Sequence, residues 1–274
     1  MSVSIESAEP HPVSPEERAE YLDFAIALAA KAGEVILPQF RRPLAIESKD
    51  SATGYDPVTE ADHGAELVMR DAIRQRYPAH GILGEEFGYR PGEGLTWVLD
   101  PIDGTRGFVM GLLHWGTLVA LFDGQRPVVG AIRQPVLDET FAGDGSRAVF
   151  IRDGETRPLV ARPCPDLGAA LAGTTTPDMF RTAREQEALD RIERAVRGMR
   201  YGTDCYLYAM LAMGHADLVL ETRLKPYDVQ ALIPVVEGAG GVITDWRGGN
   251  PAMGGDVLAA GDPRVHEQAL ACLA

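Results

Sequence analysis

The chain of 274 residues has 45% hydrophobic and 24% charged residues, a composition that excludes a disordered, a collagen-like or a membrane-embedded protein. Its 26 Lys and Arg residues stand against 40 Asp and Glu residues, which gives a formal net charge of −14 at pH 7. Because an anionic protein repels phosphate backbones and anionic lipids, we expect neither nucleic acid nor a membrane among its partners.

Residues 1–14 are expected to form a flexible leader. They are acidic and rich in proline, and they lack the basic region and apolar core of a secretory signal. The longest uncharged run, Gly107 to Phe122, is shorter than the about 20 residues that span a bilayer. The three cysteines are widely spaced and indicate neither a disulfide framework nor a zinc site. We therefore expect a cytoplasmic protein.

Two helices are predicted ahead of the first strand of the main sheet. The segment Ser14-Pro-Glu-Glu17 has the N-cap, first-turn proline and acidic first turn of a helix start, and apolar residues at spacings of three and four extend the helix to about Gln39. The second helix should follow Asp62 and end before Pro78. Its predicted inward face carries Leu67, Val68, Ala72 and Ile73.

Short β-rich runs bounded by Gly, Pro and Asp follow these helices and predict a sheet that the helices cover. The runs span residues 81–84, 96–99, 116–122 and 128–133, with two more around residues 140 and 148.

The second half of the chain predicts an alternating α/β pattern with short loops. Strands are expected at 170–174, near 199, at 217–220 and near 242 and 257, and helices at 178–196, 206–213, 229–237 and from 263. Without a low-complexity linker between the halves, we interpret residues 15–274 as one catalytic unit. It would contain two layered subdomains, about 15–155 and 156–274.

The strongest local signal is the segment Trp97-Val-Leu-Asp-Pro-Ile-Asp-Gly-Thr105, an apolar strand that ends in two carboxylates. Pro101 stiffens the turn, so Asp100 and Asp103 could converge on one point, while Gly104 and Thr105 would open a helix whose N–H groups could receive an anion. The alternative interpretation is a tight Asp-Gly turn with Asp103 as a helix N-cap.

Three further acidic groups stand at predicted element boundaries. Glu85 and Glu86 follow a short apolar run, Asp62 opens the second helix, and Asp228 starts a later helix. Each group alone is typical of a solvated loop or an N-cap. Together they offer hard oxygen ligands without the His or Cys spacing of a zinc site, which favours Mg²⁺ or a similar ion. Such a cation would also let an anionic protein accept a phosphorylated substrate.

These segments carry a resemblance to a known family. D-P-V-T-E-A-D (56–62), G-E-E (84–86), W-V-L-D-P-I-D-G-T (97–105) and Y-D-V-Q-A-L (227–232) with E-G-A-G-G-V-I-T-D (237–245) resemble the inositol monophosphatase superfamily of Mg²⁺-dependent, lithium-sensitive phosphatases. The resemblance covers roughly residues 15–274. It implies an α/β fold with alternating α-β-α-β-α layers and a homodimer.

Within that superfamily the sequence is more similar to the histidinol-phosphatase branch. The motifs that indicate this branch are D-P-I-D-G-T-R-G-F (100–108), W-G-T-L (115–118), T-T-T-P-D-M-F (174–180), G-T-D-C-Y-L-Y-A (202–209) and L-K-P-Y-D-V-Q-A-L-I-P (224–234). Tyr227 replaces the more common Trp and Gln230 replaces a small residue, changes that are expected in this branch.

The resemblance implies roles for individual residues. Glu85, Asp100 and the Ile102 carbonyl would hold one Mg²⁺, and Asp100, Asp103 and Asp228 a second. Gly104 and Thr105 would meet the phosphate through backbone N–H groups. Further roles are expected for Glu85 and Thr105, which would orient the attacking water, and for Asp62, which would support a ligand or bind a weak third ion. Lys49 could balance charge nearby, although a solvated lysine is the alternative.

The predicted reaction is hydrolysis of histidinol phosphate to histidinol and phosphate, a step of histidine biosynthesis. Because this substrate carries an ammonium and an imidazole, acidic groups beyond the phosphate would favour it over an inositol phosphate. Asp204 and Glu221 are the candidates, and a plain N-cap is the alternative for Asp204. An inositol phosphatase, a broad sugar or nucleotide phosphatase, and a non-catalytic metal or phosphate sensor remain alternative hypotheses.

Overall fold

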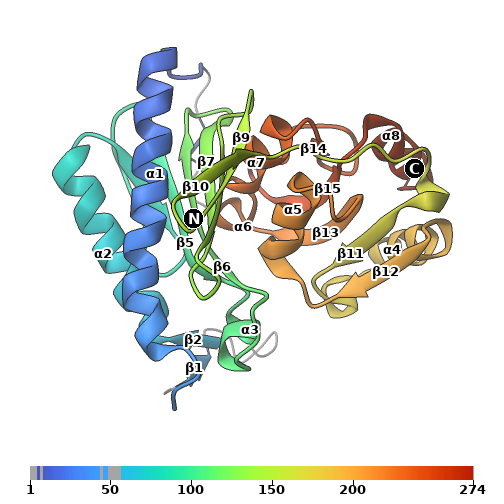
Figure 1. Ribbon diagram of the computed structural model, residues 1–274, viewed down its shortest axis with the longest axis horizontal. Helices are drawn as coiled ribbons and strands as arrows, with labels where there is room; N and C mark the ends of the chain where they lie inside the picture. Colours follow the sequence, from blue (N-terminus) through green and yellow to red (C-terminus); the bar gives the residue numbers. More distant parts are fainter. Residues whose placement is uncertain (1–4, 7–8, 44–45, 49–56, 274) are drawn as a thin grey trace.

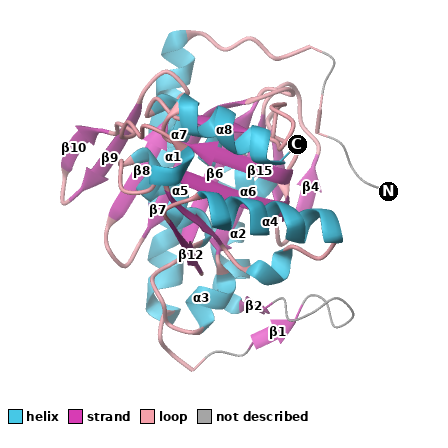
Figure 2. Ribbon diagram, turned by 90° about the vertical axis from the view of Figure 1, so that its right-hand side faces the viewer, coloured by secondary structure: helices cyan, strands magenta, loops and turns pink. Residues whose placement is uncertain are grey.

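The computed structural model of the protein describes residues 5–6, 9–43, 46–48 and 57–273. These residues form five alternating layers, which Figure 1 shows from left to right. Helices α1 (Pro15–Ile36) and α2 (Glu60–Arg76) cover one face of a first sheet. Helices α5 (Asp204–Ala212), α6 (Pro226–Val229) and α7 (Leu232–Gly238) lie between that sheet and a second one. Helices α4 (Ala183–Ala195) and α8 (Pro263–Leu273) form the outer layer on the far side (Figure 2). The predicted α-β-α-β-α sandwich is confirmed.

The first sheet has eight strands in the order β10-β9-β8-β7-β6-β5-β3-β4. Their bounds are β3 (Gly81–Gly84), β4 (Gly88–Arg90), β5 (Thr96–Asp103), β6 (Gly116–Phe122), β7 (Pro127–Gln134), β8 (Glu139–Gly143), β9 (Ala148–Arg152) and β10 (Glu155–Pro158). Every pair in this sheet is antiparallel except β3–β5, which is parallel. Therefore β3 and β5 end at the same edge. A separate antiparallel pair, β1 (Ile46–Ser48) and β2 (Pro57–Thr59), lies beside the short helix α3 (Thr105–Val109).

The second sheet has five strands in the order β12-β11-β13-β15-β14. Their bounds are β11 (Leu171–Thr174), β12 (Gly198–Tyr201), β13 (Leu218–Leu224), β14 (Val242–Thr244) and β15 (Gly255–Ala260). Three short 3₁₀ helices complete the fold: η1 (Leu37–Gln39), η2 (Leu167–Ala169) and η3 (Pro177–Met179). The division into subdomains near residue 155 stays a prediction. Among the described residues, no helix combines the length and the apolar character that crossing a bilayer requires.

The structure differs from the predicted elements in several places: α2 begins at Glu60, before Asp62, and strands β1, β2, β4 and β10 were not predicted. The strand expected at 96–99 continues to Asp103, and the helix expected from 178 begins at Ala183, after η3. The helix expected at 229–237 is split into α6 and α7. Pro234 explains the split, because it has no N–H to donate to the carbonyl of Gln230, one turn earlier.

The predicted inward face of α2 is right for Ile73 and wrong for Leu67. Leu67 is 48% exposed, and the buried face instead carries Ala61, Ala65, Met69 and Ile73, spaced four residues apart. Three polar residues, Asp62, Glu66 and Arg70, are buried on the same side of the helix. A hydrophobicity pattern assigns charged residues to the solvent-exposed side of a helix. The predicted inward face of α2 was therefore turned away from the side that these three residues share.

The middle helices pack closely on the first sheet because glycines occupy the contact points. A Cβ on Gly130 of β7 would lie 2.2 Å from the Ala231 carbonyl oxygen, and one on Gly143 of β8 would lie 2.4 Å from the Pro234 carbonyl oxygen. Both distances are far below van der Waals contact. The sheet therefore accepts the backbone of the α6–α7 segment directly, and this contact fixes the position of α6.

We predict that Gly130→Ala lowers the free energy of unfolding by about 1–3 kcal/mol, because the added methyl group must displace the α7 backbone. Gly198→Ala is the matched control, since a Cβ there would lie 3.7 Å from Leu171 Cδ2, an ordinary contact. Urea unfolding of the two variants and the parent protein measures the effect. Equal stability of the two variants would contradict the close packing described above.

Candidate functional site

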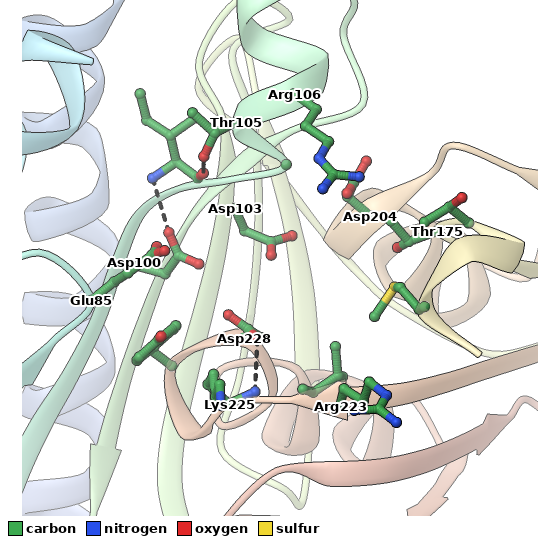
Figure 3. A pocket seen from close by; sticks show the side chains of 16 residues that line it. Glu85, Asp100, Asp103, Thr105, Arg106, Thr175, Asp204, Arg223, Lys225 and Asp228 are labelled. Atoms are coloured by element: carbon green, nitrogen blue, oxygen red, sulfur yellow. Dashed lines mark hydrogen bonds between the residues drawn. The ribbon is translucent and has the colours of Figure 1, made fainter. Parts of the chain in front are cut away.

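A cavity of about 300 Å³ opens where β3 and β5 end and where α5 and α6 begin (Figure 3). Five carboxylates line it: Glu85, Asp100, Asp103, Asp204 and Asp228. They come from four separate segments of the chain, and four of the five are predicted metal ligands. The layered fold therefore gathers most of the predicted acidic set around one space.

The end of β5 fixes the first two carboxylates. Asp100 is buried, and its Oδ1 accepts the Ile102 N–H at 3.0 Å. The pairing with β6 shifts register between Asp100 and Asp103, so an irregular turn separates the two acids. The Thr117 hydroxyl donates to the Pro101 carbonyl at 2.8 Å, and the Thr105 hydroxyl donates to the Ile102 carbonyl at 2.9 Å. The carbonyls of both residues between the two acids are thus bonded to a threonine hydroxyl.

Neighbouring elements bring the other acids to this turn. Glu85 directly follows β3, and its N–H donates to the Leu99 carbonyl of β5 at 3.2 Å. Asp228 lies in the first turn of α6, where one carboxylate oxygen accepts the Lys225 N–H at 2.7 Å. One oxygen from each of Asp100, Asp103 and Asp228 lies within 4.8 Å of the others. The predicted convergence is therefore present in the structure.

The electrostatics of this cluster favour a bound cation. Burial, followed by the charges of Glu85, Asp103 and Asp228, raises the pKa of Asp100 well above its ordinary value. Burial and the charges of Asp103 and Glu85 likewise raise the pKa of Asp228, and burial raises that of Asp103 to about 6. Converging carboxylates can all stay ionised only if positive charge is placed among them. An all-oxygen donor set of this kind suits Mg²⁺.

The sequence Gly104-Thr105 forms the entry to α3. Gly104 has a φ of +86°, and a Cβ there would lie 2.7 Å from the His114 carbonyl oxygen, so this position requires glycine. Both residues line the cavity. Asp103 is not the N-cap of α3, since Gly104 occupies that position and no side chain caps the helix. Instead, one Asp103 oxygen accepts the Cys205 N–H at 2.8 Å.

Asp204 and Glu221 lie on the α5 and β13 side of the metal-ligand candidates. Asp204 is the first residue of α5, after the N-cap Thr203, and burial raises its pKa to about 8. Glu221 is 1% exposed and lines a small pocket of about 20 Å³ together with Asp103, Asp204 and Asp228. One Glu221 oxygen accepts the Thr175 N–H at 2.7 Å, and burial raises the Glu221 pKa to about 8. Asp204 lines both the cavity and the small pocket, whereas Glu221 lines the small pocket and not the cavity.

Asp62 is buried but is not among the residues that line the cavity. It is not the N-cap of α2, because Thr59 takes that position. The Asp62 carboxylate accepts the Thr59 N–H at 2.8 Å and its hydroxyl at 2.6 Å, completing a capping box. Lys49 lies outside the described residues.

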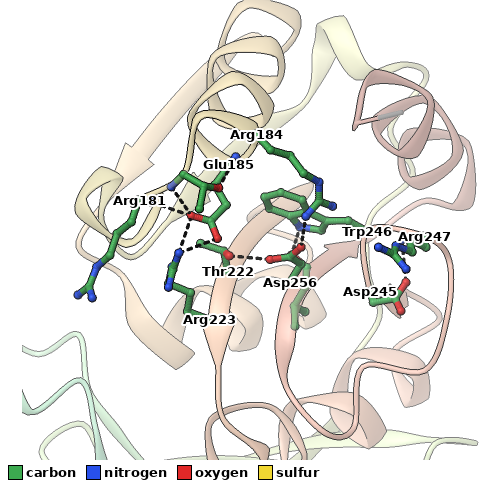
Figure 4. Close-up of polar contacts among 11 residues, drawn as sticks. Arg181, Arg184, Glu185, Thr222, Arg223, Asp245, Trp246, Arg247 and Asp256 are labelled. Carbon is green, nitrogen blue, oxygen red and sulfur yellow. Dashed lines mark hydrogen bonds and ion pairs between the residues drawn. The ribbon is translucent and has the colours of Figure 1, made fainter. Parts of the chain in front are cut away.

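Several cavity residues had no role in the sequence predictions, among them Thr175, Arg106, Lys225 and Arg223. Arg223 has a φ of +62° at an irregularity of the β13–β15 pairing, and its guanidinium pairs with Glu185 of α4 at 3.0 Å (Figure 4). A bulge within a strand leaves no clear signal in one sequence. Thr175 lies in the T-T-T-P-D-M-F motif and Lys225 in the L-K-P-Y-D motif. These two motifs were the sequence features from which both residues could have been predicted as part of the site.

Comparison with known proteins places this site in a family. The family model described as "Inositol monophosphatase family" matches residues 17–274. The "Bifunctional phosphatase IMPL2, chloroplastic" of Arabidopsis thaliana is 42% identical, over 98% of this chain and 80% of its own length. A histidinol-phosphatase of Chlorobaculum parvum is 32% identical, over 92% and 96% of the two chains.

Solved structures agree with this relationship. The solved structure of an inositol monophosphatase from Zymomonas mobilis is 42% identical in sequence and superposes with a TM-score of 0.83, covering 95% of this chain and 99% of its own. Residues 17–274, which the family model matches, include every residue that lines the acidic cavity. This chain therefore belongs to the inositol monophosphatase family and is a metal-dependent phosphomonoesterase.

Proposed function

We propose that the protein is a Mg²⁺-dependent histidinol-phosphate phosphatase, which releases histidinol and inorganic phosphate in histidine biosynthesis. The observation that carries this proposal is the pair of enclosed carboxylates, Asp204 and Glu221, beside the predicted ligand cluster. A histidinol-phosphatase among the relatives supports the same substrate. The protein is expected to act in the cytoplasm as a homodimer.

The proposed ligands are the carboxylates of Glu85, Asp100, Asp103 and Asp228 and the Ile102 carbonyl, which would hold two Mg²⁺ ions, with Asp62 supporting a ligand or a weak third ion. Bound Mg²⁺ would supply charge stabilisation for the phosphate and a lowered pKa for a water molecule. The clustered carboxylates fit a Mg²⁺ ion because of their own chemistry. The pKa values of Asp100, Asp103 and Asp228 are raised, which indicates crowded negative charge that only protons or a cation can offset.

The chain's own groups would orient the reactants. Because the Thr105 hydroxyl donates its proton to the Ile102 carbonyl, its oxygen can accept a hydrogen from the attacking water. Glu85 would accept a second hydrogen of that water and raise its nucleophilicity. The Gly104 and Thr105 N–H groups would donate to the phosphate. Because water is the proposed nucleophile, no protein thiolate is needed to attack the phosphate. Burial raises the pKa of the Cys205 thiol well above its ordinary value, which disfavours a thiolate there.

Recognition beyond the phosphate would depend on Asp204 and Glu221. Burial raises the pKa of each to about 8, so a bound ammonium would stabilise their ionised forms at neutral pH. An inositol ring offers only hydroxyl groups and would gain less from ionised partners. Inositol phosphate remains the second candidate, because the Zymomonas mobilis protein of 42% identity is described as an inositol monophosphatase.

We predict that Asp103→Asn lowers kcat/KM by about 100-fold or more while the protein stays folded, because an amide replaces a charged ligand. Asp190→Asn, at an exposed carboxylate on α4, is the control and should retain full activity. Phosphate release and circular dichroism report the two properties. A folded Asp103→Asn variant with substantial activity would refute the ligand assignment.

The substrate is tested with histidinol phosphate, inositol-1-phosphate and a sugar phosphate, each with Mg²⁺ and with EDTA. Histidinol phosphate should give the highest kcat/KM, and EDTA should abolish all turnover. Glu221→Gln should lower kcat/KM about 10-fold for histidinol phosphate and much less for inositol-1-phosphate, because it removes the charge that meets the ammonium. Asp256→Asn, a polar-network residue on neighbouring β15, is the control.

An equal effect of Glu221→Gln on both substrates would contradict the recognition proposal. A wild-type preference for inositol-1-phosphate would overturn the substrate but leave the metal-dependent chemistry intact.

Without metal, stability should fall as the pH rises from about 6.5 to 8. Burial places the folded-state pKa of Asp204 and Glu221 near 8, above the ordinary value near 4, so the folded protein binds more protons than the unfolded chain in this range. Half-buried His80 and buried His266 have pKa values that burial lowers, which is an effect of the opposite sign, but it fades above their ordinary pKa near 6.5.

Differential scanning calorimetry in EDTA measures this effect, and Tm should fall by at least about 3 °C over that range. Saturating Mg²⁺ should restore Tm more at the higher pH, where the carboxylates are ionised. The Glu221→Gln variant should show a smaller fall. A Tm that rises with pH in EDTA would contradict the electrostatic description of the site.

A further inference from the structure

Two charged residues on α2 are buried behind the β3–β4 turn, away from the lining of the cavity. Glu66 is fully buried, and Arg70, one helical turn later, is 7% exposed. The Arg70 Nε donates to Glu66 Oε1 at 2.7 Å. Burying two charges costs desolvation free energy, which must be offset by hydrogen bonds to both partners. Those bonds lead directly to the turn that follows Glu85.

The Glu66 carboxylate receives two backbone N–H groups of that turn. Glu86 N–H donates to Oε2 at 2.7 Å, and Phe87 N–H donates to Oε1 at 3.2 Å. The Arg70 guanidinium donates to the Gly88 carbonyl. One ion pair therefore binds three consecutive residues, the last two of the turn and the first of β4. An apolar side chain at position 66 could accept neither N–H group.

The last residue of β3 is shaped to admit this carboxylate. A Cβ on Gly84 would lie 2.0 Å from Glu66 Oε1 and 2.7 Å from Oε2. The Gly84 backbone is in a regular pair with Leu99 of β5, so the strand itself does not demand glycine there. Glycine is required at position 84 because the Glu66 carboxylate approaches the backbone so closely.

Glu85 lies between these two restraints. On one side its own N–H is bonded to the Leu99 carbonyl of β5, and on the other the N–H of Glu86 is bonded to Glu66. We propose that Glu66, supported by Arg70, is a positioning residue that fixes the backbone of Glu85 and so presents the Glu85 carboxylate to the metal site. This inference rests on the proposed Mg²⁺ site, and Glu66 itself does not contact the metal.

The test measures Mg²⁺ binding to metal-free protein by isothermal titration calorimetry, together with Tm and the Mg²⁺ dependence of kcat/KM. Glu66→Gln keeps the shape of the side chain but replaces one acceptor oxygen by an NH₂ group that cannot receive an N–H donor. The dissociation constant for Mg²⁺ should rise about 10-fold or more, the range found when groups that support metal ligands are changed.

Asp217→Asn is the matched control. Asp217 is also buried, also pairs with an arginine (Arg162 Nε at 2.7 Å) and also accepts a backbone N–H (Leu171 at 2.8 Å), but it precedes β13 and is not among the residues that line the cavity. Both variants should have a lower Tm, and only Glu66→Gln should lose Mg²⁺ affinity. If the two variants lose stability alike and both keep the parent's Mg²⁺ affinity, Glu66 is merely structural and the proposal is overturned.

Should Glu66→Gln fail to fold, Arg70→Lys decides by the same titration. Lysine keeps the positive charge but lacks the planar fork that donates to both Glu66 and Gly88. Weaker Mg²⁺ binding by folded Arg70→Lys supports the proposal, and unchanged binding overturns it. A parent protein that binds no Mg²⁺ would refute the proposed function itself, an outcome distinct from a parent that binds Mg²⁺ and variants that bind it equally well.

Discussion

Repulsion among enclosed carboxylates is the constraint on which the rest of this site depends. Asp100, Asp103 and Asp228 bring oxygens within 4.8 Å of one another, and burial removes the water that would screen them. The fold therefore holds an arrangement that is unfavourable at neutral pH unless positive charge enters it. The same arrangement gives a protein of net charge −14 a means to accept an anionic ester.

Each layer of the fold contributes to holding that arrangement. The parallel β3–β5 pair places Glu85 beside Asp100, and a register shift against β6 separates Asp100 from Asp103. Glycine contacts between the first sheet and the α6–α7 segment set the position of Asp228. The site therefore depends on backbone contacts remote from its chemistry, and substitutions at those contacts should disturb it without touching a ligand.

The order of the main helices and strands and the convergence of acids could be predicted because each depends on local patterns, whereas the five-layer architecture was implied by the family resemblance. Strand ends, proline-stiffened turns and capping signals are readable from short segments, as with Asp100-Pro-Ile-Asp103. The predicted α2 face was partly wrong because Glu66 and Arg70 are buried as a pair, and partners on other elements are not visible in a hydrophobicity pattern. Arg223 was missed because its strained backbone arises from strand pairing in three dimensions.

The central claim is that these acids form a cation site, and a crystal structure grown with Mn²⁺ in place of Mg²⁺ tests it most directly. Manganese has the same preference for oxygen ligands and gives an anomalous signal that identifies it. The account predicts anomalous density enclosed by Glu85, Asp100, Asp103 and Asp228, with Glu85 held as in the metal-free protein. The same four side chains turned away from one another, with no anomalous density among them, would contradict it.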